Sequence, residues 1–344
     1  MKYILEKLAC AALLAVMLVA PAAAQVPAPL DPPEKVKVAY VPIMKFATMY
    51  VAAQRGLFEK YGLEVELERV KSGTEAIAFL TQGSVDVGGI AIVTSLWNGW
   101  SRGLDLRIIA PGALEPIEGG TTGIYVRKDL YDSGEITSAA DLEGRRLASA
   151  GGPGSGGEYI SSVALRRGNL TIRDVEMINM SNADMPAAIE AGSVDAVMTG
   201  SPYSDQMQQA GTAVMLERDL IPGLMTVAFV GSGKFVNQRP EVARRFVLAL
   251  TEASRMMQGD DYLAPENIEA YLSYTNSTED IIRSGKPVVY DPNMVIPVEK
   301  LSDIEDIHRT NGRTEYDTPI DMSNVVDGSF VEQAIEVVGP YKGI

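Results

Sequence analysis

Short β-strand patterns alternate with helical patterns along almost the whole sequence. Residues 35–42 alternate apolar and polar side chains as a strand does, residues 49–61 have helical spacing, and residues 63–70 alternate again. A parallel pair of strands needs a crossover of this kind. The same order continues through residues 74–113. The pattern therefore predicts an α/β fold.

Two segments far apart in the chain repeat one another. Residues 78–90 and 187–200 both contain a helical stretch, a Gly-Ser-Val-Asp turn and a strand. Each glycine can end its helix, and each aspartate can start the next strand by binding local amides. A second set of strand and helix units also begins after Thr121. The repeat predicts two similar α/β lobes.

The order of the units gives expected boundaries for these lobes. Lobe 1 is expected over residues 36–121 together with 227–344, and lobe 2 over residues 122–226. Residues 121–126 and 225–230 are expected to be two hinge strands. Such a hinge would allow the lobes to close around a ligand.

The first 24 residues have the pattern of a secretory signal peptide. Lys2 and Lys7 precede an apolar run of 13 residues, and three alanines end at Ala24. The run is too short to span a bilayer, although an uncleaved anchor or a buried helix is the alternative. We expect cleavage near Ala24, a periplasmic location, and a flexible leader rich in proline and alanine over residues 25–35.

Charge and composition exclude several classes of function. The net charge of -15 argues against a nucleic-acid partner, since phosphate binding needs a basic surface. Cys10 is the one cysteine and lies in the signal peptide, so the mature chain has no disulfide and no thiolate site. The one histidine, His308, lies in a polar segment and is expected at the surface. We expect no metal and no cofactor.

The sequence resembles the periplasmic solute-binding proteins of ABC transporters that take up sulfonates, taurine, nitrate and thiamine pyrimidine precursors. The motifs that carry the resemblance are AAQRGLFEKYGLEVEL at 52–67, QGSVDVGG at 82–89, PGSGGEYISSVALRRG at 153–168, AAIEAGSVDAVMTGSPY at 187–203 and PIDMSNVVDGSFVEQA at 319–334. The resemblance implies a two-lobed type II binding protein, with two hinge crossovers and a ligand cleft between the lobes. It also implies a small-molecule ligand and delivery to a membrane permease with its ATPase subunit. We expect a monomer.

Ligands of open α/β sheets bind outside the carboxyl ends of the strands, where loops and helix N-termini converge. In this chain, Lys45 could pair with an anion and Phe46 could stack on a planar ligand, although Lys45 could also be an ordinary surface lysine. A glycine-rich turn at residues 152–157 opens a helix and lets backbone amides approach a ligand. The expected ligand-binding residues are Pro42, Lys45, Phe46, Gly73, Thr74, Ile90, Ala91, Ser155, Gly156, Gly157, Thr199, Ser201 and Tyr203.

Two other functions remain open at this stage. Related two-lobed folds include enzymes that act on a small carboxylate or a pyrimidine, and Glu158 and Asp184 are the carboxylates nearest the expected cleft. The export signal favours transport over these enzymes, and an extracellular sensor would need an attached signalling domain. The glycine turn and Lys45 favour an anionic or heterocyclic ligand, with sulfonates and pyrimidine-like precursors almost equal.

Overall fold

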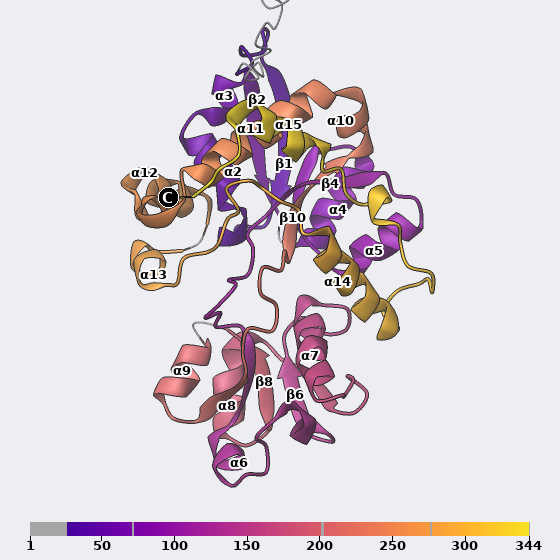
Figure 1. Ribbon diagram of the computed structural model, residues 1–344, viewed down its shortest axis with the longest axis vertical. Helices are drawn as coiled ribbons and strands as arrows, with labels where there is room; N and C mark the ends of the chain where they lie inside the picture. The colour runs from indigo at the N-terminus through magenta and orange to yellow at the C-terminus, as the bar shows by residue number, and fades with distance from the viewer. Residues whose placement is uncertain (1–25, 71, 201–202, 276, 344) are drawn as a thin grey trace, which may run out of the picture.

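The computed structural model describes residues 26–70, 72–200, 203–275 and 277–343. The expected signal peptide, residues 1–24, lies outside these described residues. Within them, no helix is both long enough and apolar enough to cross a membrane. The chain forms two lobes joined by two connecting segments (Figure 1).

Lobe 1 is built on a five-stranded sheet in the order β2-β1-β3-β10-β4. Strands β1, β2 and β3 are parallel, while β10 runs antiparallel between β3 and β4. The strands are β1 (Glu34–Tyr40), β2 (Leu63–Arg69), β3 (Val87–Ala91), β4 (Leu106–Pro111) and β10 (Val227–Ser232).

Lobe 2 repeats this topology with the order β7-β6-β8-β5-β9. Here β6, β7 and β8 are parallel, and β5 runs antiparallel between β8 and β9. The strands are β5 (Gly123–Arg127), β6 (Arg146–Ser149), β7 (Glu176–Asn179), β8 (Ala196–Thr199) and β9 (Ala213–Glu217). The predicted fold class, two α/β lobes with two crossovers, is confirmed.

Helices cover both sheets. In the segments that flank the lobe 1 sheet they are η1 (Met44–Phe46), α2 (Ala47–Gln54), α3 (Leu57–Lys60), α4 (Gly73–Gln82), α5 (Thr94–Ser101), α10 (Gly233–Gln238), α11 (Pro240–Arg255), η4 (Gly259–Leu263), α12 (Pro265–Tyr274), α13 (Glu279–Ser284), α14 (Val298–Thr310), η5 (Met322–Asn324) and α15 (Ser329–Val338). In lobe 2 they are α6 (Lys128–Asp132), η2 (Ala139–Leu142), α7 (Gly156–Arg167), η3 (Asn182–Asp184), α8 (Met185–Glu190) and α9 (Tyr203–Gln209). The longest, α11, starts with a proline at its first position and buries its apolar face against α2 and α15.

The two crossovers run through residues 112–122 and 218–226. The segments expected to be hinge strands instead lie mostly inside the sheets, as β5 in lobe 2 and β10 in lobe 1. The crossovers lie side by side, because the Glu115 amide donates to the Leu224 carbonyl at 2.8 Å and the Gly223 amide donates to the Glu115 carbonyl at 3.0 Å. Each crossover thus leads directly into the antiparallel strand that completes a sheet.

The aspartate of the repeated Gly-Ser-Val-Asp turn makes the same kind of hydrogen bond in both lobes. Asp86 Oδ2 accepts the backbone amide of Lys37 at 3.0 Å, and Asp195 Oδ2 accepts the backbone amide of Arg146 at 3.0 Å. These amides belong to the neighbouring strands β1 and β6, whereas the sequence suggested amides close in the chain. The aspartate therefore joins its own strand to the parallel strand beside it.

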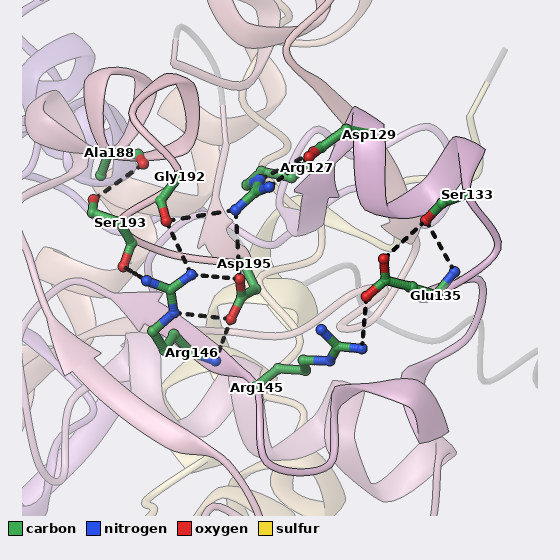
Figure 2. A network of polar contacts seen from close by, with 10 residues as sticks. All are labelled: Arg127, Asp129, Ser133, Glu135, Arg145, Arg146, Ala188, Gly192, Ser193 and Asp195. Carbon is green, nitrogen blue, oxygen red and sulfur yellow. Dashed lines mark hydrogen bonds and ion pairs between the residues drawn. The ribbon is translucent and has the colours of Figure 1, made fainter.

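In lobe 2 this aspartate is also the centre of an ionic network, which Figure 2 shows. The Arg146 guanidinium donates to Asp195 Oδ1 at 2.7 Å and to the carbonyls of Gly192 and Ser193. Arg127 approaches the same carboxylate at 3.7 Å. Burial alone would raise the pKa of Asp195, but the hydrogen bonds from Arg146 outweigh it and lower the pKa below its ordinary value.

The leader contacts lobe 1 over its described residues, where the sequence suggested a flexible link. The Leu30 amide donates to the Tyr61 carbonyl at 3.3 Å, and the Arg245 guanidinium donates to the Ala28 carbonyl. Strand β1 already begins at Glu34. On the side of the leader, these contacts are made by backbone groups, which carry no sequence pattern.

We expect Asp195→Asn to lower the free energy of unfolding by about 2 kcal/mol, because the variant leaves the Arg146 guanidinium without its carboxylate. Denaturant unfolding of the full mature chain measures this. The difference from wild type should hold above about pH 5 and shrink as the pH falls through the lowered pKa, since only the ionised carboxylate stabilises the fold.

Asp132→Asn is the matched control for this change. Asp132 pairs with Lys128 on the exposed surface of the same lobe, at 2.8 Å, so its loss should cost less than about 0.5 kcal/mol. An equal effect of the two substitutions would contradict the structural role of the turn aspartate.

Candidate functional site

A cavity of about 310 Å³ lies between the two lobes. Both lobes, both crossovers and α14 contribute side chains to it. The lining residues are Ile43, Lys45, Ala91, Ile92, Val93, Glu115, Thr122, Gly156, Tyr159, Ile160, Thr226, Val227 and Ile304. Most of these are apolar, which is typical of a small-molecule pocket with a few polar groups that fix orientation.

The topology explains why the cavity lies here. Strands β1 and β3 are parallel, so the loops after them, at Ile43–Lys45 and Ala91–Val93, lie at the same edge of the lobe 1 sheet. The loop after β6 leads into α7, whose first turn reaches the cavity at Gly156. The crossovers add Glu115 and Thr226, because they pass between the two sheet edges.

Lys45 is held in the cavity wall by two partners from the crossovers. Its ammonium donates to Glu115 Oε1 at 2.5 Å and to Thr226 Oγ1 at 2.8 Å. Two tyrosine hydroxyls hold the turn that carries Lys45. The Tyr50 hydroxyl donates to the Ile43 carbonyl at 3.0 Å, and the Tyr290 hydroxyl donates to the Met44 carbonyl. The position of this lysine is therefore set by the fold and not by a ligand.

The glycine-rich turn before α7 has a conformation that requires glycine. Gly151, Gly152 and Gly154 have φ values of 96, 70 and 74°, in the left-handed region. Ser155 caps the helix by accepting the Glu158 amide at 3.2 Å. The Gly154 carbonyl accepts the Thr94 hydroxyl at 3.0 Å, which brings the turn into contact with α5 of lobe 1.

A set of polar contacts between α7 and the segment 303–313 joins the lobes beside the cavity, and we call it the interlobe clasp. Glu158 is buried and accepts the Arg313 guanidinium with both carboxylate oxygens, at 2.7 to 3.1 Å. The Tyr159 hydroxyl donates to Asp303 Oδ2 at 3.0 Å. Figure 1 shows α14 lying between the upper lobe and α7.

His308 lies inside this clasp, and the expectation that it is a surface residue was wrong. Its side chain is fully buried, with the ring edge-on to Tyr159 at 6.2 Å. Asp303, Asp306 and Thr310 on the same helix are exposed or partly exposed, whereas His308 and Glu305 lie on its buried face. Burial lowers the pKa of His308 below its ordinary value.

Three of the thirteen predicted site residues line the cavity, namely Lys45, Ala91 and Gly156. They come from the loop after β1, the end of β3 and the start of α7, as the topology argument required.

The other predicted residues do not line the cavity as the structure has it. Phe46 and Ile90 are buried in the core, where Phe46 packs edge-on against Phe229 at 5.6 Å. Thr199 is buried and donates to Asn182 Oδ1 at 3.2 Å. The Ser155 hydroxyl donates to the Ala150 carbonyl at 3.1 Å, and a Cβ atom at Gly157 would lie 2.2 Å from the same carbonyl oxygen. Of the remaining predicted residues, Pro42, Gly73, Thr74 and Tyr203 lie outside the lining, and Ser201 is outside the described residues.

Sequence analysis missed most of the cavity wall. Glu115, Thr122 and Thr226 lie in the crossovers, which have no periodic pattern, and Ile304 lies on α14, whose position depends on tertiary packing. The resemblance to type II binding proteins placed both crossovers at the hinge. Polar residues of the crossovers, such as Glu115, could have been predicted as cavity residues on this ground.

The carboxylates considered for an enzyme are engaged elsewhere or exposed. Glu158 is taken up by Arg313, and Asp184 lies at the surface, where it accepts the Ser181 hydroxyl at 2.6 Å. Among the described residues, no group of three or more His, Cys, Asp or Glu side chains could hold a metal ion. The arrangement can enclose a small molecule and orient it through the polar groups of the crossovers.

Comparisons with known proteins agree with this geometry. The model of the NMT1-like family matches residues 30–272. A candidate binding protein of Brucella abortus is 24% identical over 208 residues, which cover 59% of this chain and 60% of that protein. The chain thus matches less than two thirds of the length of this relative.

Solved structures share the fold at low sequence identity. The ligand-binding component of an ABC-type import system from Staphylococcus aureus has a TM-score of 0.65 at 16% identity, over 88% of this chain and 99% of that one. The periplasmic aliphatic sulphonate-binding protein of Escherichia coli has a TM-score of 0.65 at 19% identity, over 85% and 91%. A desulfurization enzyme has a TM-score of 0.57 at 17% identity, over 88% and 99%. The resemblance predicted from the motifs is confirmed, and the fold occurs in both binding proteins and an enzyme.

We expect Arg313→Met to open the clasp, because it leaves the buried Glu158 carboxylate without its partner. The free energy of unfolding should fall by about 2 to 3 kcal/mol, and the radius of gyration from X-ray scattering should rise as the lobes separate. Arg283→Met is the control, since Arg283 pairs with Glu279 at the surface and its loss should cost less than about 0.5 kcal/mol. An unchanged radius of gyration would contradict the clasp.

His308 makes a separate prediction about pH. Its folded-state pKa is lowered, so the unfolded chain binds a proton more readily and stability should fall as the pH drops below about 6.5. When the pH is lowered from 7.5 to 5.5, the free energy of unfolding should fall by about 1 kcal/mol less in His308→Phe than in wild type. Because the chain has one histidine, its NMR resonance can also be followed alone, and an ordinary titration midpoint would contradict the burial.

Proposed function

The chain belongs to the NMT1-like family, and from this premise we propose that it is the extracytoplasmic solute-binding component of an ABC importer. The observation that carries the proposal is the cavity of about 310 Å³, which is lined by residues of both lobes and both crossovers. A binding protein needs such a space, together with a hinge that lets the ligand enter. The names of the relatives and of the similar binding-protein structures support the same function.

The proposed mechanism is closure of the lobes around a small organic molecule. Lobe 1, residues 36–121 with 227–344, and lobe 2, residues 122–226, rotate about the paired crossovers. A ligand that contacts Lys45 and Ala91 in lobe 1 and Gly156 in lobe 2 binds the closed form better than the open form, so it shifts the population toward closure. The closed monomer then presents both lobes to a membrane permease, and the ATPase subunit drives release. The export pattern of residues 1–24 supports a periplasmic location.

An enzyme of the same two-lobed fold is the second candidate, since one solved structure with this fold is a desulfurization enzyme. The two candidates differ in whether the bound compound is consumed. In this chain Glu115, which lines the cavity, is paired with Lys45, and Glu158 beside the cavity is paired with Arg313. These ion pairs support binding, because they hold both carboxylates ionised and engaged and so disfavour acid or base chemistry.

We predict that one compound among sulfonates, nitrate, bicarbonate, pyrimidines, aromatic carboxylates and amines will raise the melting temperature of residues 25–344. At a concentration one hundred times the dissociation constant, the shift should be roughly 5 °C. Gly156→Leu should weaken this binding at least about tenfold, because a side chain at Gly156 meets no atom within 4 Å and would extend into the cavity.

The control for this substitution is Gly328→Leu, which also adds a side chain where no atom lies within 4 Å, far from the cavity. It should leave the affinity within about twofold. Equal binding by both variants would place the ligand elsewhere, and consumption of the compound, followed by chromatography, would favour the enzyme.

A further inference from the structure

The charges around the cavity do not suit an anionic ligand. Among the described residues that line it, Lys45 and Glu115 are the charged ones, and their ion pair at 2.5 Å cancels the positive charge that an anion would need. An oxyanion bound to Lys45 would also lie next to the Glu115 carboxylate. Two like charges at such a short distance repel each other strongly in a partly buried site.

A second carboxylate extends this acidic end of the cavity. Asp219 lines a small recess of about 10 Å³ that shares Glu115 and Thr122 with the main cavity. Its Oδ1 atom is buried and has no hydrogen-bond partner among the described residues. The nearby cations are engaged with other groups. Arg167 donates to the Asp219 carbonyl at 2.9 Å and to the Glu217 carboxylate at 2.8 Å, and Lys300 donates to the Pro222 carbonyl at 2.6 Å.

The other cationic feature of the cavity is also occupied. The N-terminus of α7 would attract an anion through its amides and its dipole. Glu158, in the first turn of the helix, already accepts the Gly154 amide at 3.2 Å, and its carboxylate is also paired with Arg313, so these two side chains add no net charge at the α7 N-terminus. Lys45 is therefore the charged cation of the cavity lining, and it is matched by Glu115.

We propose that Glu115 and Asp219 make the cavity selective for a small amine with an apolar body and no net negative charge. The protonated amine donates to Glu115 and to the unpartnered oxygen of Asp219, and the apolar body packs against Ile92, Ile160 and Ile304. This inference rests on the proposed binding function. It names a ligand class whose charge is opposite to that of the aliphatic sulphonates named for the Escherichia coli structure.

The test uses matched probe pairs in which an amine and a carboxylate share one body, such as 2-phenylethylamine and 3-phenylpropionate, with calorimetric titration of residues 25–344 at pH 7. Wild type should bind amines at least tenfold more tightly than the matching carboxylates. Glu115→Gln and Asp219→Asn should each reduce this ratio at least fivefold. Glu118→Gln, in the same crossover but outside both cavity linings, removes the same charge and should leave the ratio within twofold.

Wild-type data alone decide the ligand class, so the test holds even if a variant folds poorly. Equal or tighter binding of carboxylates, no binding of any amine, or an unchanged ratio in Glu115→Gln and Asp219→Asn would each overturn the inference. A sulfonate or nitrate that binds wild type at the cavity would overturn it and leave the proposed binding function standing. If no compound of either set binds at the cavity, both proposals fall.

Discussion

Parallel strands end at the same edge of a sheet, and this constraint determines where the protein can hold a ligand. Each lobe has four strands that run in the same direction and one that is reversed, and the loops after β1, β3 and β6 converge on one space between the lobes. The chain crosses that space twice and hydrogen-bonds to itself at Glu115. Loops, helix starts and crossovers therefore meet at this place, and the cavity contains side chains from all three.

The features that the sequence predicted well are those set by local interactions. The Gly-Ser-Val-Asp repeat indicated two similar lobes because the left-handed glycine that ends each helix acts over a few residues. The aspartate of each turn instead accepts an amide of the neighbouring strand, and it does so in the same way in both lobes. Lys45, Ala91 and Gly156, which line the cavity, were predicted because each lies near the end of a strand or at the start of a helix. Phe46, one residue after Lys45, turns into the core, since neighbouring residues of a tight helical turn face different directions.

The residues that the sequence did not reveal are positioned by contacts between distant segments. Glu115 and Asp219 lie in crossovers without apolar periodicity. The position of Glu115 follows from its contact with Lys45 and from the pairing of the two crossovers, and Asp219 lies in a recess that Glu115 also lines. His308 lies in a polar stretch of sequence, yet it is buried because the face of α14 that carries it packs against Tyr159 of α7. A single sequence carries no record of which helix covers which face, so burial at such positions follows only from the assembled fold.

The interlobe clasp changes the energetics expected of the hinge. A ligand shifts a conformational equilibrium only by its difference in affinity for the two states, and its apparent affinity falls with the fraction of protein in the competent state. Glu158, Tyr159 and Ser162 already bind partners across the lobes at one side of the cavity, through Arg313, Asp303 and Asn311. These contacts stabilise the approach of the lobes without a ligand. Under the proposed function, a ligand therefore needs to supply only the remaining part of the closing free energy. In a cavity of about 310 Å³, the polar groups available for this are those of Lys45, Glu115 and Thr226.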